Sequence, residues 1–247
     1  MLFSGTKLSD LSKASIIIIL AGFALVGGAV YFFTELAADV LEQEKFFVDE
    51  TATDVVRSIT TPWMDTFWGW TTDLGSVLFI SIASVALLIF LLFFSPFSRW
   101  VGIYFAIVMI GISALTKLLK VSFERQRPEV LAEYDGTGFS FPSGHTTGSV
   151  VFYGFLIYLI VISPLKKPWK WTVNIALGML IALIGLSRVY LGVHFLTDVV
   201  GGMLFGLAWL LVCIAALEIT IWNQRRRQSG SVQTLSKGKT ERKQEKG

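Results

Sequence analysis

Residues Asp198–Ile221 read DVVGGMLFGLAWLLVCIAALEITI, and almost all of them are apolar. A run of about twenty such residues is long enough for a helix to cross the hydrocarbon core of a bilayer. Small residues such as Gly201, Gly202 and Gly206 allow helices in a membrane to pack closely. This stretch therefore predicts a transmembrane helix.

Five further runs of this kind precede it along the chain: Ala14–Phe33, Asp73–Phe94, Trp100–Leu119, Thr147–Ser163 and Trp171–Leu186. Hydrophobic residues make up 53% of the chain, and the mean hydropathy is +0.65. Both values exceed what a water-soluble domain usually carries. The sequence thus predicts an all-α membrane protein with six transmembrane helices, in a single membrane domain over residues 14–221.

The basic residues near the span ends indicate the orientation. They gather before the first span, between spans two and three, between spans four and five, and after span six: Lys7, Lys13, Arg99, Lys166, Lys167, Lys170, Arg225, Arg226 and Arg227. By the positive-inside rule, both termini are predicted to be cytoplasmic. Residues 1–13 would form a short cytoplasmic segment. Residues 222–247 would form a basic cytoplasmic tail, which we expect to be disordered because it has few apolar residues to bury.

The longest connection on the outer side covers residues 35–72. Within it, Leu36–Ile59 has apolar residues at helical spacing among acidic ones, which predicts a helix lying along the interface. An aromatic cluster follows at Trp63, Phe67, Trp68 and Trp70. The segment is either a lid or lipid access guide, or a solvated connector with an aromatic anchor. The interfacial preference of aromatic residues favours the connector.

Three polar islands interrupt the apolar pattern: Lys120 with Arg127-Pro128, then Pro142-Ser143-Gly144-His145, then Ser187-Arg188 with His194 and Asp198. The first two flank the loop between spans three and four. The third flanks the loop between spans five and six, two crossings further on. The even number of crossings predicts that all three islands lie on the outer face of the membrane.

Each island taken alone has a purely structural interpretation. Lys120 and Arg127 could snorkel from a helix end towards water. Ser143 or Thr146 could cap the fourth helix, and Asp198 could cap the sixth. A histidine four residues before an aspartate favours function for the third island, because one helical turn would bring imidazole and carboxylate into contact. The convergence of three islands on one face favours a functional site.

The cations and the Ser-Gly pair suit phosphate chemistry. Phosphoryl transfer is catalysed mainly by positioning and by charge stabilisation. Lys120, Arg127 and Arg188 supply positive charge, the arginines with bidentate geometry for phosphate oxygens. Ser143 can donate its hydroxyl, and Gly144 lets a backbone N–H approach the anion.

The chain has only two histidines, and both lie in these islands. Asp198 can keep one ring nitrogen of His194 protonated and leave the other as a nucleophile. His145 is then available to protonate the leaving oxygen. The same His145, His194 and Asp198 also resemble a two-histidine-one-carboxylate metal site. Three nearby cations argue against a divalent ion, so we expect neither a metal nor a cofactor.

The islands together resemble the three-part signature of the type 2 phosphatidic acid phosphatase superfamily, which is Lys-x6-Arg-Pro, Pro-Ser-Gly-His and Ser-Arg-x5-His-x3-Asp. All motif positions match. The resemblance implies a metal-independent lipid phosphatase that passes through a phosphohistidine at His194, with His145 as the acid and Asp198 as the partner of His194. It also implies a set of residues around the phosphate: Lys120, Arg127, Ser143, Gly144 and Arg188.

The short chain and short loops look like bacterial members of the family, of the phosphatidylglycerophosphatase B or undecaprenyl-diphosphatase type. The expected function is hydrolysis of a lipid phosphate monoester or diphosphate at the outer face of the cell membrane. The substrates considered are phosphatidylglycerol phosphate, undecaprenyl diphosphate, phosphatidic acid and lipid A phosphates. We expect no nucleic-acid partner. The alternative is a non-catalytic membrane protein, similar to a flippase or sensor, whose cations bind anionic headgroups.

Overall fold

A computed structural model describes residues 13–44, 46–128, 134 and 136–244, so most of the predicted N-terminal segment lies outside the described residues. The described chain is helical, and six of its segments are long and apolar enough to cross a membrane. They lie in α1 (Lys13–Leu41), α3 (Pro62–Asp73) with α4 (Val77–Phe93), α5 (Arg99–Phe123), α6 (Gly144–Ile162), α7 (Lys167–Tyr190) and α8 (Leu196–Gln244). The prediction of an all-α protein with six spans is confirmed.

Most helices are longer than the apolar runs that predicted them. Hydropathy marks only the part of a helix that suits hydrocarbon, whereas the helix continues into the interface, where polar side chains reach water. α6 begins at Gly144 rather than Thr147, because the Ser143 side chain caps its first turn. α5 continues to Phe123 and ends where Glu124 adopts a left-handed conformation with φ of 49°.

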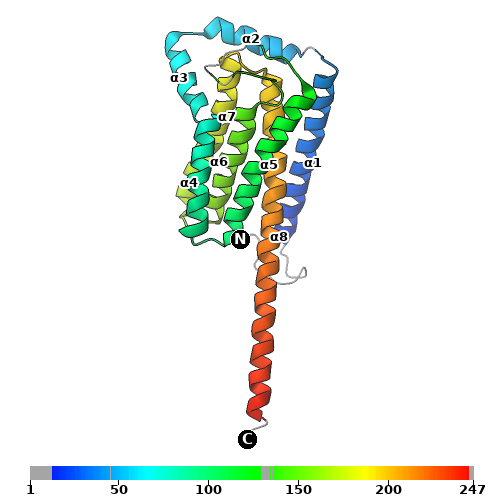
Figure 1. Cartoon of the computed structure of the whole chain (residues 1–247), viewed down its shortest axis with the longest axis vertical. Helices are drawn as coiled ribbons and strands as arrows, with labels where there is room; N and C mark the ends of the chain where they lie inside the picture. Colours follow the sequence, from blue (N-terminus) through cyan, green and yellow to red (C-terminus); the bar gives the residue numbers. More distant parts are fainter. Residues whose placement is uncertain (1–12, 45, 129–133, 135, 245–247) are drawn as a thin grey trace.

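The connector over residues 35–72 forms a roof across one end of the bundle (Figure 1). The structure divides the predicted interfacial helix in two: α1 runs on to Leu41, and a turn with Gln43 at φ 58° leads into α2 (Phe47–Ile59). α2 lies across this end and contacts α7 and α8. α3 then descends along α7 to α4. The connector is therefore packed against the bundle over the ends of the long helices.

Helix α8 is central, because it packs against α1, α5 and α6. Glycines bring α6 and α8 close together: a Cβ on Gly202 would lie 2.9 Å from the Ser143 carbonyl oxygen, and one on Gly206 would lie 3.1 Å from that of Thr147. Phe155 and Leu217 are fully buried in the core between these helices. Close packing through small residues is what association inside a bilayer requires.

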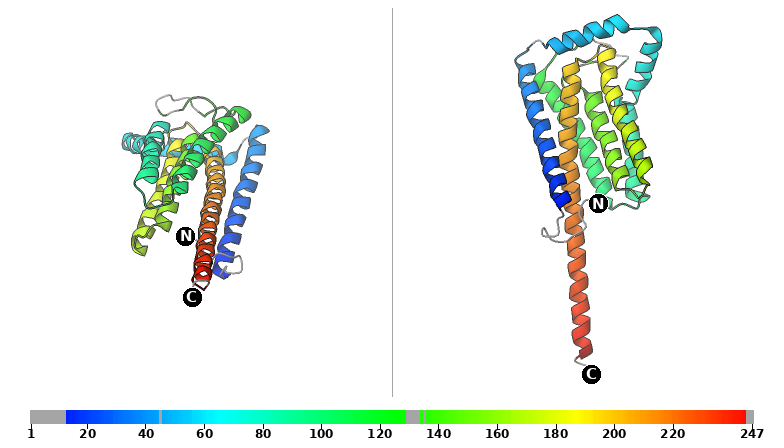
Figure 2. Two further views of the ribbon diagram at one scale, coloured as in Figure 1. Left: turned by 60° about the horizontal axis from the view of Figure 1, so that its bottom comes forward. Right: turned by 180° about the vertical axis from the view of Figure 1, so that it is seen from behind.

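The C-terminal part of α8 differs from the prediction of a disordered tail. The helix continues to Gln244 and projects beyond the bundle, at the end opposite α2 (Figure 2). The sequence after Ile221 has no proline, and its many Arg, Lys and Gln residues have good helix propensity. Because α8 is already formed, adding residues to it carries no nucleation cost. Composition alone therefore predicted too little order here.

Candidate active site

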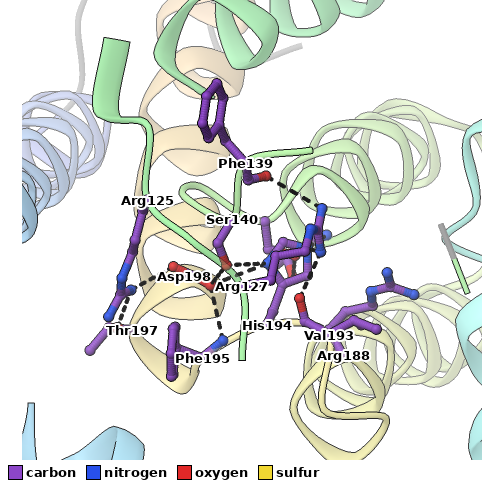
Figure 3. Close-up of polar contacts among 12 residues, drawn as sticks. Arg125, Arg127, Phe139, Ser140, Arg188, Val193, His194, Phe195, Thr197 and Asp198 are labelled. Atoms are coloured by element: carbon purple, nitrogen blue, oxygen red, sulfur yellow. Dashed lines mark hydrogen bonds and ion pairs between the residues drawn. The ribbon is translucent and has the colours of Figure 1, made fainter. Parts of the chain in front are cut away.

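The structure brings the three islands to one end of the bundle, the end that α2 covers (Figures 1 and 3). Each of the helices α5 to α8 contributes site residues, either from its turn nearest this end or from the adjoining loop. The predicted site residues are Lys120 at the end of α5, Arg127 in the loop after it, Ser143, Gly144 and His145 at the start of α6, Arg188 at the end of α7, His194 in the next loop and Asp198 in the first turn of α8.

His194 and Asp198 are in contact. The imidazole Nδ1 lies 3.2 Å from the carboxylate Oδ2, and both side chains are buried. The expected helical turn is not what joins them, because His194 precedes α8. The chain instead turns at Gly192, whose φ of 68° is in the left-handed region that favours glycine. This turn carries His194 back towards the start of α8.

Further donors hold the Asp198 carboxylate in place (Figure 3). Oδ2 accepts hydrogen bonds from the Ser140 hydroxyl and from the backbone N–H of Phe195, the latter at 2.9 Å. Oδ1 accepts from Nη1 of Arg125 at 2.6 Å. With these donors in place, the carboxylate can orient the imidazole by accepting its Nδ1–H. The other ring nitrogen, Nε2, then carries a lone pair.

The opposite side of the imidazole faces a cation. Nε2 of His194 lies 3.0 Å from Nη1 of Arg127. Burial lowers the pKa of His194 to about 3, even though the adjacent Asp198 acts to raise it. The imidazole is therefore neutral near pH 7, with the unprotonated nitrogen that a nucleophile needs.

Arg127 and Lys120 are fixed by backbone carbonyls, which lie in the loop before α6 and, for Arg127, also in the loop before α8. Arg127 donates to the carbonyl oxygens of Gly138 at 2.9 Å and of Val193 at 2.6 Å. The Lys120 Nζ donates to the carbonyl oxygen of Phe139 at 2.5 Å. Neutral carbonyls orient the two cations without cancelling their charges. Both remain suited to a phosphate placed beside His194.

Arg188 is fully buried and approaches from α7. Its Nη1 donates to the Thr72 hydroxyl on α3 at 2.7 Å, and its Nη2 donates to the carbonyl oxygen of Tyr134 at 2.5 Å. The guanidinium is close enough to act electrostatically on His145, as are Arg127 and Lys120. The third cation thus belongs to the same electrostatic site.

The first turn of α6 supplies backbone and hydroxyl donors. Ser143 is the N-cap, as one interpretation predicted, and its Oγ accepts from the Thr146 hydroxyl at 3.0 Å. The Ser143 hydroxyl accepts in this contact, so it can still donate its own hydrogen to another group. Gly144 lies next to Lys120, since a Cβ there would be 3.8 Å from Cε of that lysine. Backbone N–H groups at a helix start favour anions, so this turn suits a phosphate.

Several polar residues of this region were missed by sequence reasoning: Asp49, Thr72, Arg125, Ser140 and Thr197. Arg125 and Ser140 lie within two residues of recognised motif positions, so closer attention to the neighbours of those motifs could have found them. Asp49 and Thr72 belong to the connector and carry no local signal. Their place depends on how α2 and α3 fold over the bundle.

Within the part of the chain that the structure describes, no three His, Cys, Asp or Glu side chains are grouped so as to hold a metal ion. The absence of a metal from the reaction stays a prediction. The fold and the site define a multi-span membrane protein with a histidine–aspartate pair set among cations suited to phosphate.

Comparison with known proteins identifies the family. Residues 100–222 match the PAP2 superfamily. The chain is 34% identical to phosphatidylglycerophosphatase B of Bacillus subtilis (strain 168) over 177 residues, which cover 71% of this chain and 86% of that protein. The chain therefore belongs to the PAP2 superfamily, and the predicted family is confirmed.

Two further comparisons agree with this membership. The crystal structure of a transmembrane PAP2 type phosphatidylglycerolphosphate phosphatase from Bacillus subtilis matches with a TM-score of 0.69 at 32% identity, covering 78% of this chain and 96% of the other. An undecaprenyl-diphosphatase of Sulfolobus acidocaldarius is 33% identical over 119 residues, or 47% of this chain and 51% of that protein. The fold is thus shared over nearly the whole length of a solved family member.

Proposed function

We propose that this protein is a lipid phosphatase, which hydrolyses a phosphate monoester or diphosphate from a lipid in the bilayer. The observation that carries the proposal is the orientation of His194. Its Nδ1 is turned to Asp198 at 3.2 Å, while its Nε2 faces Arg127 at 3.0 Å. A nucleophilic nitrogen beside a phosphate-binding guanidinium suits attack on phosphorus.

The first step forms a phosphohistidine. The Nε2 lone pair of His194 bonds to phosphorus as the bond between phosphorus and the lipid oxygen breaks. With the phosphate anion bound among the cations, His145 is protonated and transfers its proton to the leaving oxygen. Asp198 stabilises the positive charge that develops on the imidazole ring of His194.

The second step returns the enzyme to its starting state. A water molecule attacks the phosphorus, and the phosphorus–nitrogen bond to His194 breaks. Neutral His145 takes a proton from that water and so regains its acidic form. Inorganic phosphate is released. Throughout both steps the phosphate oxygens are held by Lys120, Arg127, Arg188, the Ser143 hydroxyl and the Gly144 backbone N–H.

The proposed site faces the extracytoplasmic side of the cell membrane, and both termini are cytoplasmic. Support comes from the basic residues at the opposite end of the bundle, such as Arg225 and Lys167. A membrane-impermeant thiol reagent tests this in a Cys213→Ser background, because the chain has one cysteine. Asp54→Cys on α2 should react in intact cells, whereas Arg225→Cys should react only after lysis. The reverse pattern would overturn the orientation.

The substrate classes follow from the relatives, which are named as phosphatases of phosphatidylglycerol phosphate and undecaprenyl diphosphate. Phosphatidic acid carries a phosphate monoester, as phosphatidylglycerol phosphate does, and another relative is named as a lipid A 4'-phosphatase. The test is phosphate release by purified protein from all four lipids. Wild type should release phosphate from at least one, His194→Ala from none, and Gly178→Ala at the wild-type rate, since that glycine has open space around it.

Trapping of the phosphohistidine intermediate distinguishes an enzyme from a protein that only binds lipids. Acid-labile, base-stable label should appear on wild type after rapid mixing with a phosphorus-labelled substrate, and should be absent from His194→Ala. A flippase-like or sensor-like protein would bind the same lipids without releasing phosphate. Binding with no release from any of the four lipids would refute the enzyme.

A further inference from the structure

Arg125 links the roof helix to the histidine–aspartate pair. Its Nη1 donates to Oδ1 of Asp198 at 2.6 Å, and its Nη2 donates to Oδ2 of Asp49 at 2.9 Å. Asp49 lies in the first turn of α2, so one guanidinium joins carboxylates from α2 and α8. Such a planar fork can serve two carboxylates at once, which a lysine ammonium does less well.

The position of this guanidinium is closely defined. Phe195 lies against it with the ring centroid 4.4 Å from Cζ, and Phe46 lies at 5.4 Å. These are cation–π distances, and the Arg125 side chain is 14% exposed. The carbonyl oxygen of Arg125 also accepts the backbone N–H of Ser140 at 2.8 Å. Ser140 in turn donates to Asp198, so Arg125 acts on that carboxylate by two routes.

Asp49 is held in place as firmly as Arg125. It is 4% exposed and accepts the backbone N–H of Thr197 at 2.9 Å and the Thr197 hydroxyl at 2.6 Å. Thr197 is the residue directly before Asp198 in α8. The start of α2 is therefore tied to the start of α8 through both backbone and charge.

We propose that Arg125 and Asp49 are positioning residues for the His194–Asp198 pair, an inference that rests on the proposed function. Arg125 occupies Oδ1 of Asp198 and leaves Oδ2 to accept the Nδ1–H of His194. Asp49 holds Arg125 in that geometry. The roof helix α2 is thereby a working part of the active site, beyond its role as a connector.

Stability alone is a poor reason for this network. Buried ion pairs pay for their desolvation, and well-packed apolar residues would often hold two helices together as well or better. Outer partners of a reactive imidazole, by contrast, set its tautomer and ring orientation. The network ends on Asp198, the carboxylate that contacts His194, which is where a positioning function requires it.

The kinetic test uses Arg125→Gln, Arg125→Lys and Asp49→Asn. We expect kcat to fall about 10- to 100-fold in Arg125→Gln, by analogy with the loss of a carboxylate or carbonyl partner behind a metal-bound histidine, with KM nearly unchanged. Arg125→Lys should recover part of the loss. Asp49→Asn should lower kcat less, and should add little to Arg125→Gln in the double variant. The matched controls are Asp54→Asn, an exposed carboxylate of α2, and Arg225→Gln in the tail.

A spectroscopic test reads the positioning without turnover. Because the chain has two histidines, a His145→Asn background leaves the imidazole nitrogens of His194 alone in a nitrogen-15 spectrum. With Arg125 present, His194 should hold its proton on Nδ1. With Arg125→Gln, a mixture of Nδ1–H and Nε2–H tautomers should appear. Asp54→Asn should keep the first pattern.

The outcomes separate this inference from the proposed function. Wild-type inactivity on all lipids would refute the phosphatase, and the tautomer of His194 would still decide the role of Arg125. An active wild type whose kcat and tautomer are unchanged by Arg125→Gln would overturn the inference alone. If Arg125→Gln lowers kcat, raises KM and lowers thermal stability together while the tautomer of His194 is unchanged, Arg125 is structural. That result would also overturn the inference.

Discussion

Replacing Gly202 with alanine should disturb the site from within the helix packing. A Cβ at this position would lie 2.9 Å from the Ser143 carbonyl oxygen and 3.0 Å from the Thr147 Oγ1. An ordinary contact begins near 3.4 Å, so α6 and α8 must separate by about half an ångström at the motif turn. Overpacking of this kind costs about 1–3 kcal/mol. Misplacement by 1 Å can cost about a hundredfold in rate, so half of that predicts about a tenfold lower kcat.

Gly178→Ala is the matched control, because a Cβ on that glycine of α7 meets nothing within 4 Å. Both variants gain the same helix propensity, about 1 kcal/mol, so their difference isolates the contact between α6 and α8. Thermal unfolding in detergent measures the stability, and phosphate release measures kcat. If Gly202→Ala is as stable and as active as Gly178→Ala, the close approach of these helices does not position the site.

Three other predictions follow from buried groups and from the proposed chemistry. Burial lowers the pKa of His194 from 6.5 to about 3, so between these pH values the unfolded chain takes up a proton that the folded chain does not. The free energy of unfolding should therefore fall by about 1.4 kcal/mol between about pH 8 and about pH 5.5. His194→Gln should lack this part of the dependence in a denaturation series. Vanadate should compete with the lipid in inhibition assays, and chelators should leave the rate unchanged; a loss that zinc or magnesium restores would contradict this. Tyr158→Phe removes the 2.8 Å hydrogen bond to the buried Glu218 carboxylate, so thermal unfolding should show about 1–3 kcal/mol less stability at unchanged kcat.

The main outline of the site could be predicted because each motif lies at the end of an apolar run. A span fixes where its ends are, and the number of crossings fixes which ends share a face. Hydropathy and the order of the motifs therefore assign Lys120, His145 and Arg188 to the same end of the bundle. Six long helices leave few other arrangements, and the helix ends that carry these residues lie at the end of the bundle that α2 crosses.

The contacts that Asp49 of α2 makes with Arg125 and Thr197 could not be predicted in the same way. Asp49 stands among other acidic residues on an amphipathic segment, where a solvated face is the ordinary interpretation. Its contact with Thr197 depends on the turn at Gln43, which ends α1 and directs α2 across the bundle. The tail failed for a different reason: composition predicts whether a segment can fold alone, whereas here α8 already supplies the helix to which residues are added.

Helices α2 and α3 allow the site to meet two opposing requirements, one set by insertion into the membrane and one set by catalysis. Charged side chains at helix ends are cheaper to insert than charges at the bilayer centre, which favours a site at the end of the bundle. Catalysis by charge favours a site shielded from water, where each cation acts more strongly on the phosphate. With α2 and α3 in place, Arg188 and Asp198 are fully buried although they lie at the bundle end. Loss of the Asp49 anchor should therefore weaken the reaction mainly through Arg125, whose guanidinium Asp49 holds against the buried Asp198 carboxylate.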